Sequence, residues 1–303
     1  MADAKIKLAM DLPEGYDTQA VLVFHGRDKE DIAETVTETS LTKGIVLGGA
    51  PAAFHVKFSA EKRRANCTVD VDGAVTDAMR AKAREVAKSL LGLRIDPMAF
   101  AMAVAKDPVF GPLTARQAGL RIVQVASIYE ALTWAILGQQ INVSFAVALR
   151  RTFIQLAGRR HSSGLWCYPT PDDAARVPLD ELTSRKFSRA KAETVLRLST
   201  LLANGELDLL ESQGNPIEAI TQALLGVKGI GPWTVNYALL RGYGHTDSSL
   251  HGDVAVRSAI ARLWGHAQRP AVGETEAFLE QYAPHRTMAA AHLWASLNAP
   301  SAF

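Results

Sequence analysis

Short apolar runs separated by polar turns fill the first third of the chain and predict a β-rich fold. Hydrophobic and polar positions alternate over residues 66–71, with Cys67, Val69 and Val71 on one face, which is the period of a half-buried strand. Further runs of this kind predict strands over residues 5–12, 35–41 and 52–59.

Two other stretches in this part of the chain are candidates for helices. Residues 78–91 have apolar positions at helical spacing and predict an amphipathic helix. Residues 18–24 fit either a strand or a helix capped by Asp17. We therefore expect residues 1–107 to form an α+β N-terminal domain, in which an antiparallel sheet carries helices on one face.

The hydrophobic period changes to that of helices from about residue 108 onward. Ser127 and Glu130 form a capping box before an apolar run, because each side chain can bind backbone N–H groups that lack a partner in the first helical turn. Helices are expected over residues 128–139, 142–158, 179–184, 188–204, 217–225, 233–241, 254–264, 274–281 and 287–297. Residues 108–303 are therefore expected to form an all-α bundle.

A glycine-rich hairpin joins two of these predicted helices. Residues 225–235 read Leu-Gly-Val-Lys-Gly-Ile-Gly-Pro-Trp-Thr-Val. Gly229 and Gly231 can adopt positive φ angles, and Ile230 between them can pin the turn against both helices. Turn amides beside a helix N-terminus favour an anion such as phosphate. The loop alone is equally compatible with a packing turn and with a phosphate-binding turn.

Composition narrows the classes of protein that fit. The 303 residues carry a formal charge of +2, which neither demands nor excludes a nucleic-acid partner. The two cysteines, Cys67 and Cys167, cannot build a four-thiolate iron–sulfur cluster or a disulfide framework. The chain has no apolar run near the roughly 20 residues of a membrane span and no signal peptide, so we expect a cytoplasmic protein without a membrane.

The hairpin and several further strings resemble one known family when they are taken together and in order. These strings are Leu-Gly-Leu-Arg-Ile-Asp-Pro-Met-Ala-Phe at 91–100, Gly-Leu-Arg at 119–121, Ala-Ile-Leu-Gly-Gln-Gln at 135–140 and Ser-Arg-Ala-Lys-Ala at 188–192. Over roughly residues 85–300 the sequence resembles the helix–hairpin–helix (HhH-GPD) DNA glycosylases, in the alkylation-repair branch of DNA-3-methyladenine glycosylase II. The resemblance implies an all-α glycosylase region over 108–303, with the helix–hairpin–helix motif at 217–241.

The resemblance also implies a catalytic carboxylate. In the family, an aspartate follows the last glycine of the hairpin by a little over twenty residues, and Asp253 stands twenty-two residues after Gly231. Asp253 also precedes the predicted helix 254–264 and could serve only as its N-cap. The spacing favours catalysis, and the other nearby acid, Asp247, is expected to face solvent in a turn.

Aromatic side chains are expected to line the substrate pocket. Trp233 and Tyr237 are spaced i and i+4 and so share one helix face, where they could also be ordinary core residues. The resemblance assigns both to the pocket, together with Val254 and His285, which stand where the family often has a tyrosine and a tryptophan. His285 could equally be only a packing residue. Trp233 also occupies the place of the Schiff-base lysine of strand-cleaving relatives, so the implied enzyme is monofunctional.

The expected activity is hydrolysis of the N-glycosidic bond of alkylated purines, 3-methyladenine and related bases, after base flipping. The implied partner is double-stranded DNA that contains alkylated bases, bound by a monomer at the bacterial nucleoid. Two alternatives remain open: a helix–hairpin–helix glycosylase for deaminated or oxidised bases, and a non-catalytic DNA-binding homologue.

The resemblance further implies how DNA is held. Lys228, Gly229, Ile230 and Gly231 would meet a phosphate, and the backbone at Val227 and Gly229 could hold a monovalent cation, Na or K; no other cofactor is required. Gln139 and Gln140 stand where the family inserts a wedge into the gap left by the base, although either could instead cap a helix. Ten basic residues between 150 and 197 could be a solvated surface or could contact the DNA backbone.

Overall fold

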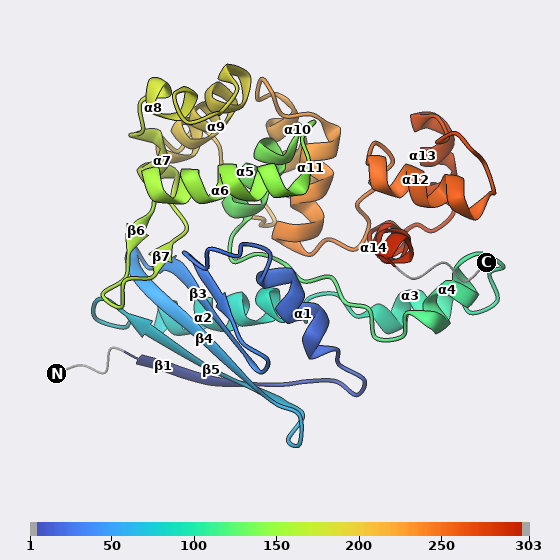
Figure 1. The fold of residues 1–303 in the computed structure, drawn as a ribbon, viewed down its shortest axis with the longest axis horizontal. Coiled ribbons are helices and arrows are strands. Elements are labelled where there is room, and N and C mark those ends of the chain that lie inside the picture. Colours follow the sequence, from blue (N-terminus) through green and yellow to red (C-terminus); the bar gives the residue numbers. More distant parts are fainter. Residues whose placement is uncertain (1–4, 299–303) are drawn as a thin grey trace.

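The computed structural model describes residues 5–298, which begin with a five-stranded antiparallel sheet in the order β1-β5-β4-β3-β2 (Figure 1). The strands are β1 (Lys5–Asp11), β2 (Glu34–Val36), β3 (Ser40–Leu47), β4 (Ala50–Ser59) and β5 (Arg64–Val71). The register places Leu41, Val56 and Cys67 next to one another, so their buried side chains share one face of the sheet.

Two helices, α1 (Thr18–His25) and α2 (Asp77–Leu90), pack on this sheet and complete an apolar core. The ambiguous stretch 18–24 is helical, because Asp17 accepts a hydrogen bond of 3.0 Å from the backbone N–H of Ala20 and so caps α1. The expected N-terminal antiparallel sheet with helices is thereby confirmed.

The predicted strand over 35–41 is wrong, since this stretch covers the end of β2, a turn and only the start of β3. β3 continues through Lys43 and Gly44, which do not fit an apolar alternation. Lys43 is buried because two carboxylates pair with it. A Cβ on Gly44 would lie 2.0 Å from the carbonyl oxygen of Trp166, so close backbone packing selects glycine there.

The rest of the described chain is mainly helical, as expected from its period. The elements are α3 (Pro97–Ala103), α4 (Phe110–Arg116), α5 (Ile128–Gly138), α6 (Val143–Ala157), a two-stranded ribbon of β6 (Arg159–Arg160) and β7 (Trp166–Cys167), α7 (Pro171–Ala175), α8 (Leu179–Thr183), α9 (Arg189–Ala203), α10 (Ile217–Leu225), α11 (Pro232–Ala238), a π-helical turn η1 (Leu239–Tyr243), α12 (Val254–Leu263), α13 (Val272–Glu280) and α14 (Arg286–Asn298). No helix within residues 5–298 is long and apolar enough to cross a membrane.

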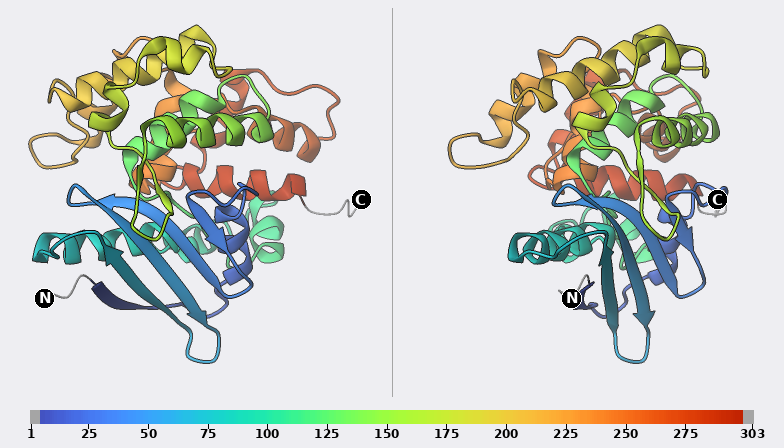
Figure 2. Two further views of the ribbon diagram at one scale, coloured as in Figure 1. Left: turned by 60° about the vertical axis from the view of Figure 1, so that its left-hand side comes forward. Right: turned by 90° about the vertical axis from the view of Figure 1, so that its left-hand side faces the viewer.

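The helices form two further apolar cores beside that of the sheet, and Figure 2 shows the helical part stacked on one end of the sheet. One core lies among α5, α6 and α9–α11, around Leu132 and Phe153. The other joins α3 and α4 to α12–α14, around Phe100 and Met288. The division of the chain at residue 107 stays a prediction, and α3, which precedes it, packs on α14.

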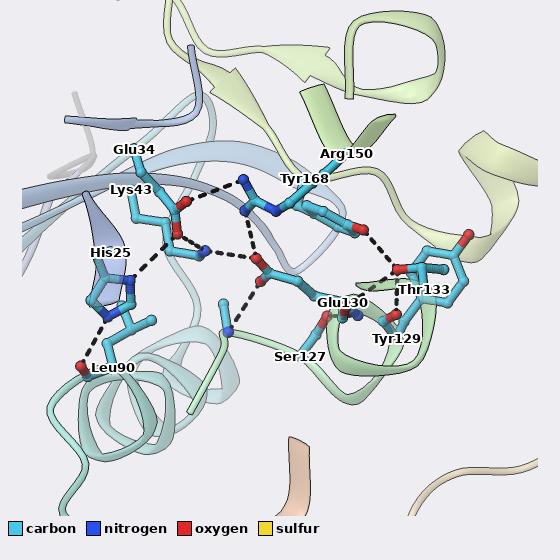
Figure 3. Close-up of polar contacts among 11 residues, drawn as sticks. His25, Glu34, Lys43, Leu90, Ser127, Tyr129, Glu130, Thr133, Arg150 and Tyr168 are labelled. Carbon is cyan, nitrogen blue, oxygen red and sulfur yellow. Dashed lines mark hydrogen bonds and ion pairs between the residues drawn. The ribbon is translucent and has the colours of Figure 1, made fainter. Parts of the chain in front are cut away.

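A buried ionic network joins the sheet to the helical part (Figure 3). Lys43 of β3 donates to Glu34 of β2 and, at 2.8 Å, to Glu130 of α5. Arg150 of α6 bridges the same two carboxylates, at 3.1 Å from Glu34 and 2.8 Å from Glu130. Two cations thus balance two anions in a nearly solvent-free junction, and His25 adds contacts to Glu34 and to the carbonyl oxygen of Leu90.

The charges in this network hold its acids ionised. Burial alone would raise the pKa of Glu34, but Arg150 and Lys43 outweigh it and hold the pKa well below its ordinary value. The same two cations lower the pKa of Glu130 against the opposing effect of burial. Glu130 is also the third residue of α5, so the network fixes the position of this helix against the sheet.

Candidate active site

Asp253 lies at the N-terminus of α12 and is held by four N–H donors. Its Oδ1 caps the helix by accepting from the backbone N–H groups of Ala255 and Val256, each at 2.9 Å. The same oxygen accepts from the indole N–H of Trp294 at 3.0 Å, and Oδ2 accepts from that of Trp233 at 2.8 Å. Only 9% of Asp253 is exposed, so the donors fix one orientation of an acceptor-only group.

The two indoles reach Asp253 from elements that are distant in sequence. Trp233 is in the first turn of α11, directly after the hairpin, so the predicted spacing from Gly231 brings hairpin and carboxylate together. Trp294 comes from α14, and the sequence analysis missed it. Its only sequence signal was a tryptophan within a predicted helix, which also describes an ordinary core residue.

The other expected pocket residues are placed differently from one another. The ring of Tyr237 lies 5.5 Å from that of Trp233, beside the carboxylate site. Val254 follows Asp253 and is 56% exposed, so the site opens to solvent on this side. The ring centroid of His285 lies 6.2 Å from that of Phe100 in α3, which is a packing contact, and its place in the pocket stays a prediction.

The sheet domain also contributes to the surroundings of the site through α1. The guanidinium of Arg241, in η1, lies 5.6 Å from the ring centroid of Trp294 and 4.7 Å from that of Phe24. Arg241 also donates to the carbonyl oxygen of Val123 at 2.5 Å. Phe24 is therefore one contact removed from the indole that holds Asp253.

The hairpin between α10 and α11 has a positive φ at one of its two glycines, since Gly231 is extended with a φ of −110°. Gly229 has a φ of +97°, and a Cβ there would lie 2.0 Å from Oγ1 of Thr194, so only glycine fits. Ile230 is buried under the turn, as expected, whereas Lys228 is exposed. Within residues 5–298, no acceptor binds the backbone N–H groups of Lys228, Gly229 and Gly231. These amides are free to bind an anion.

The loop after α5 is tied to this hairpin. The side chain of Gln139 donates to the carbonyl oxygen of Gly229 at 3.2 Å and to Oγ1 of Thr234 at 3.0 Å. Lys191 donates to the carbonyl oxygens of Leu137 and Gln139 and so binds the C-terminal end of α5. Gln140 is exposed with a φ of +56°, and its side chain makes no hydrogen bond to the described residues. The two glutamines therefore differ: hydrogen bonds hold the side chain of Gln139 against the hairpin, whereas that of Gln140 is exposed and makes no hydrogen bond to the described residues.

Ion pairs bear on two expectations about charge. Asp247 is half-buried rather than fully exposed to solvent, because Arg286 binds both of its carboxylate oxygens at 2.7 Å. Burial would raise the pKa of Asp247, and the Arg286 charge and hydrogen bond lower it overall. Most basic residues between 150 and 197 have acidic partners, which are Glu34 and Glu130 for Arg150, Asp28 for Arg151, Asp173 for Arg159 and Arg176, Glu181 for Arg185, and Glu193 for Arg189.

The described residues contain no group of three or more His, Cys, Asp or Glu side chains that could hold a metal ion. The hairpin offers carbonyl oxygens instead. That of Val227 accepts from the N–H of Ile230, and that of Gly229 accepts from Gln139. Since a carbonyl has two lone pairs, each keeps one that could bind a cation.

Comparison with known families shows to which superfamily the chain belongs. The family model described as HhH-GPD superfamily base excision DNA repair protein matches residues 133–285. The chain belongs to this superfamily. The model of the AlkA N-terminal domain matches residues 7–127, which include the sheet, α1 and α2.

Similar proteins extend the match over most of the chain. A DNA-3-methyladenine glycosylase of Bacillus subtilis is 25% identical over 290 residues, which are 95% of this chain and 96% of that protein. The Bacillus subtilis protein YfjP is 33% identical over 181 residues, 60% of this chain, and the match spans only 63% of YfjP. A 3-methyladenine DNA-glycosylase structure from Archaeoglobus fulgidus has the same fold, with a TM-score of 0.77 and 20% identity over 95% of this chain and 97% of that one.

Proposed function

We propose that this protein is a monofunctional DNA glycosylase of base excision repair, which hydrolyses the N-glycosidic bond of alkylated purines, 3-methyladenine and related bases. The observation that carries the proposal is the Asp253 carboxylate, held by two indoles directly beside the hairpin. The Bacillus subtilis glycosylase, which matches almost the whole chain, supports the substrate class.

The site has the groups that this chemistry needs. Cleavage leaves positive charge on the sugar, and a carboxylate near C1′ stabilises it. The base departs with the electron pair of the C1′–N bond, and a water oxygen then bonds to C1′ and loses a proton. A base alkylated at N3 or N7 is cationic and leaves neutral, so the site needs no second acid. The rings of Trp233, Tyr237 and Trp294 can stack on such a cation.

No lysine occupies the position of Trp233, so no Schiff base with the sugar forms there and the product is an intact strand with an abasic site. DNA would be held at the free amides of the hairpin, where a monovalent cation on the carbonyls of Val227 and Gly229 could bridge to phosphate. Gln140 would fill the gap left by the flipped base. We further propose that the protein acts as a monomer on double-stranded DNA in the bacterial cytoplasm.

A base-release assay tests this function. The protein is incubated separately with methylated, deaminated and oxidised duplex DNA, and the released bases are identified by chromatography. We expect free 3-methyladenine from the methylated DNA, and strand breaks only after alkaline treatment. Release from only deaminated or oxidised DNA would replace the proposed substrate class. Binding of all three DNAs without release of any base would exclude glycosylase activity and would favour a non-catalytic DNA-binding protein.

A further inference from the structure

One exposed arginine outside the site described above is held in place by aromatic rings. The guanidinium carbon of Arg27, two residues after α1 ends, lies 4.1 Å from the ring centroid of Phe24 and 4.9 Å from that of Trp134. Trp134 is half-buried on α5, so the two contacts join the sheet domain to the helical part. Such stacking holds a long side chain in one orientation at little cost to its N–H donors.

Arg27 has no ion-pair or hydrogen-bond partner among residues 5–298. The adjacent acid, Asp28, forms an ion pair with Arg151 instead, with 2.5 Å between Nη2 and Oδ1. Glu30 also pairs with Arg151, with 3.7 Å between Oε1 and Nη1. Arg150 and Arg151, which lie near this junction on α6, are both paired with carboxylates. Arg27 therefore presents an ordered positive charge with unused N–H donors to solvent.

A series of ring contacts connects Arg27 to the proposed catalytic centre. Phe24, which it covers, also contacts Arg241, and Arg241 contacts Trp294 beside Asp253. Burial, and to a smaller extent the charge of Arg27, lower the pKa of Arg241, which agrees with this proximity. Trp134 lies one helical turn before Gly138, the last residue of α5, after which the loop with Gln140 begins.

We propose that Arg27 is a preorganised phosphate-binding residue, by which the sheet domain holds the DNA backbone next to the flipped nucleotide. The planar fork of N–H groups matches two phosphate oxygens, and the rings fix the fork before DNA arrives. The inference rests on the proposed function, since that function makes DNA the anion at this place. The sheet domain is thereby part of the DNA-binding surface as well as a support for the helices.

The test is the salt dependence of DNA binding by Arg27→Gln, with a duplex that contains a tetrahydrofuran abasic-site analogue. One lost phosphate contact should reduce the slope of log affinity against log salt concentration by about 0.9. Affinity at low salt should fall by about tenfold. Arg63→Gln is the matched control, because Arg63 is exposed in the β4–β5 turn and its side chain makes no hydrogen bond or ion pair with the described residues.

Arg27→Lys separates phosphate binding from packing. It retains the charge and loses the fork, so we expect the wild-type slope with an affinity at least threefold weaker, and this variant carries the test if Arg27→Gln does not fold. Wild-type slope and affinity in both variants would overturn the inference. Base release by the wild-type protein is measured in parallel, so that a failure of the proposed function is distinguished from a failure of this phosphate contact.

Discussion

At the scale of single residues, the two carboxylate oxygens of Asp253 have different partners, and the proposed function gives them different tasks. Oδ1 accepts three hydrogen bonds, two from the first turn of α12 and one from Trp294, whereas Oδ2 accepts one, from Trp233, among residues 5–298. The cap alone would leave the side chain free to tilt about its bond to the backbone. The indoles remove this freedom, and Oδ2 keeps acceptor capacity for the sugar or for water.

Replacing Trp294 with Phe tests this positioning. The change keeps most of the ring and removes one N–H donor to a charged acceptor, so we expect a roughly tenfold lower single-turnover excision rate. The helix cap stays intact, and the melting temperature should therefore change little. Trp264→Phe serves as control, because Trp264 lies at the opposite end of α12 and packs on Phe278. An unchanged excision rate in Trp294→Phe would contradict the positioning role.

Sequence could identify Asp253 and Trp233 because both are defined by their distance from the hairpin. It could not identify Trp294, since nothing in a helical pattern distinguishes an indole that packs from one that also donates to a carboxylate 41 residues away. For His285 the sequence left two roles open, pocket lining and packing, and the contact of its ring with Phe100 is a packing contact.

At the scale of elements, the hairpin could be predicted because its geometry is local. The positive φ of Gly229, +97°, and the burial of Ile230 between two helices both depend on eleven consecutive residues. The tether from Gln139 to Gly229 could not be predicted, since it joins residues 90 positions apart. The same limit explains why the bounds of β3 were not predicted. Lys43 and Gly44 interrupt its apolar alternation, because Lys43 pairs with Glu130 and Gly44 packs against the backbone of Trp166, which both belong to other elements.

At the scale of the whole molecule, the two parts of the chain meet through charges that no pattern revealed. Glu34 and Lys43 come from the sheet, and Glu130 and Arg150 come from the helical part. A buried network of this kind specifies one relative placement, because any shift leaves a charge without its partner. That placement brings Arg27 of the sheet domain to Trp134 of α5, and Phe24 to Arg241, which contacts Trp294 beside Asp253.

Stability should fall as the pH is lowered below about 6.5. Burial lowers the pKa of His25, and lowers that of His292 from 6.5 to about 4. Below about pH 6.5 the unfolded chain therefore binds more protons than the folded protein, which favours unfolding. His292 alone accounts for a loss of up to about 3 kcal/mol by pH 4. Below about 4.5, the depressed pKa values of Glu34 and Glu130 add a further loss.

Urea unfolding between pH 8 and pH 5 measures this dependence. The free energy of unfolding should decrease steadily below about pH 6.5, and His292→Gln should decrease less steeply than the wild-type protein. Equal stability at pH 8 and pH 5 would contradict the buried, neutral state of these histidines.

The most direct test of the account compares Asp253→Asn with the wild-type protein in single-turnover excision of 3-methyladenine and in binding to abasic-site DNA. The asparagine oxygen can still cap α12, so the fold should persist while the charge beside C1′ is lost. Asp96→Asn is the matched control, since Asp96 caps α3 by accepting from Met98. The account predicts an excision rate lower by about 10²- to 10³-fold and nearly unchanged abasic-site binding. Excision at the wild-type rate, or equal loss of excision and binding, would contradict it.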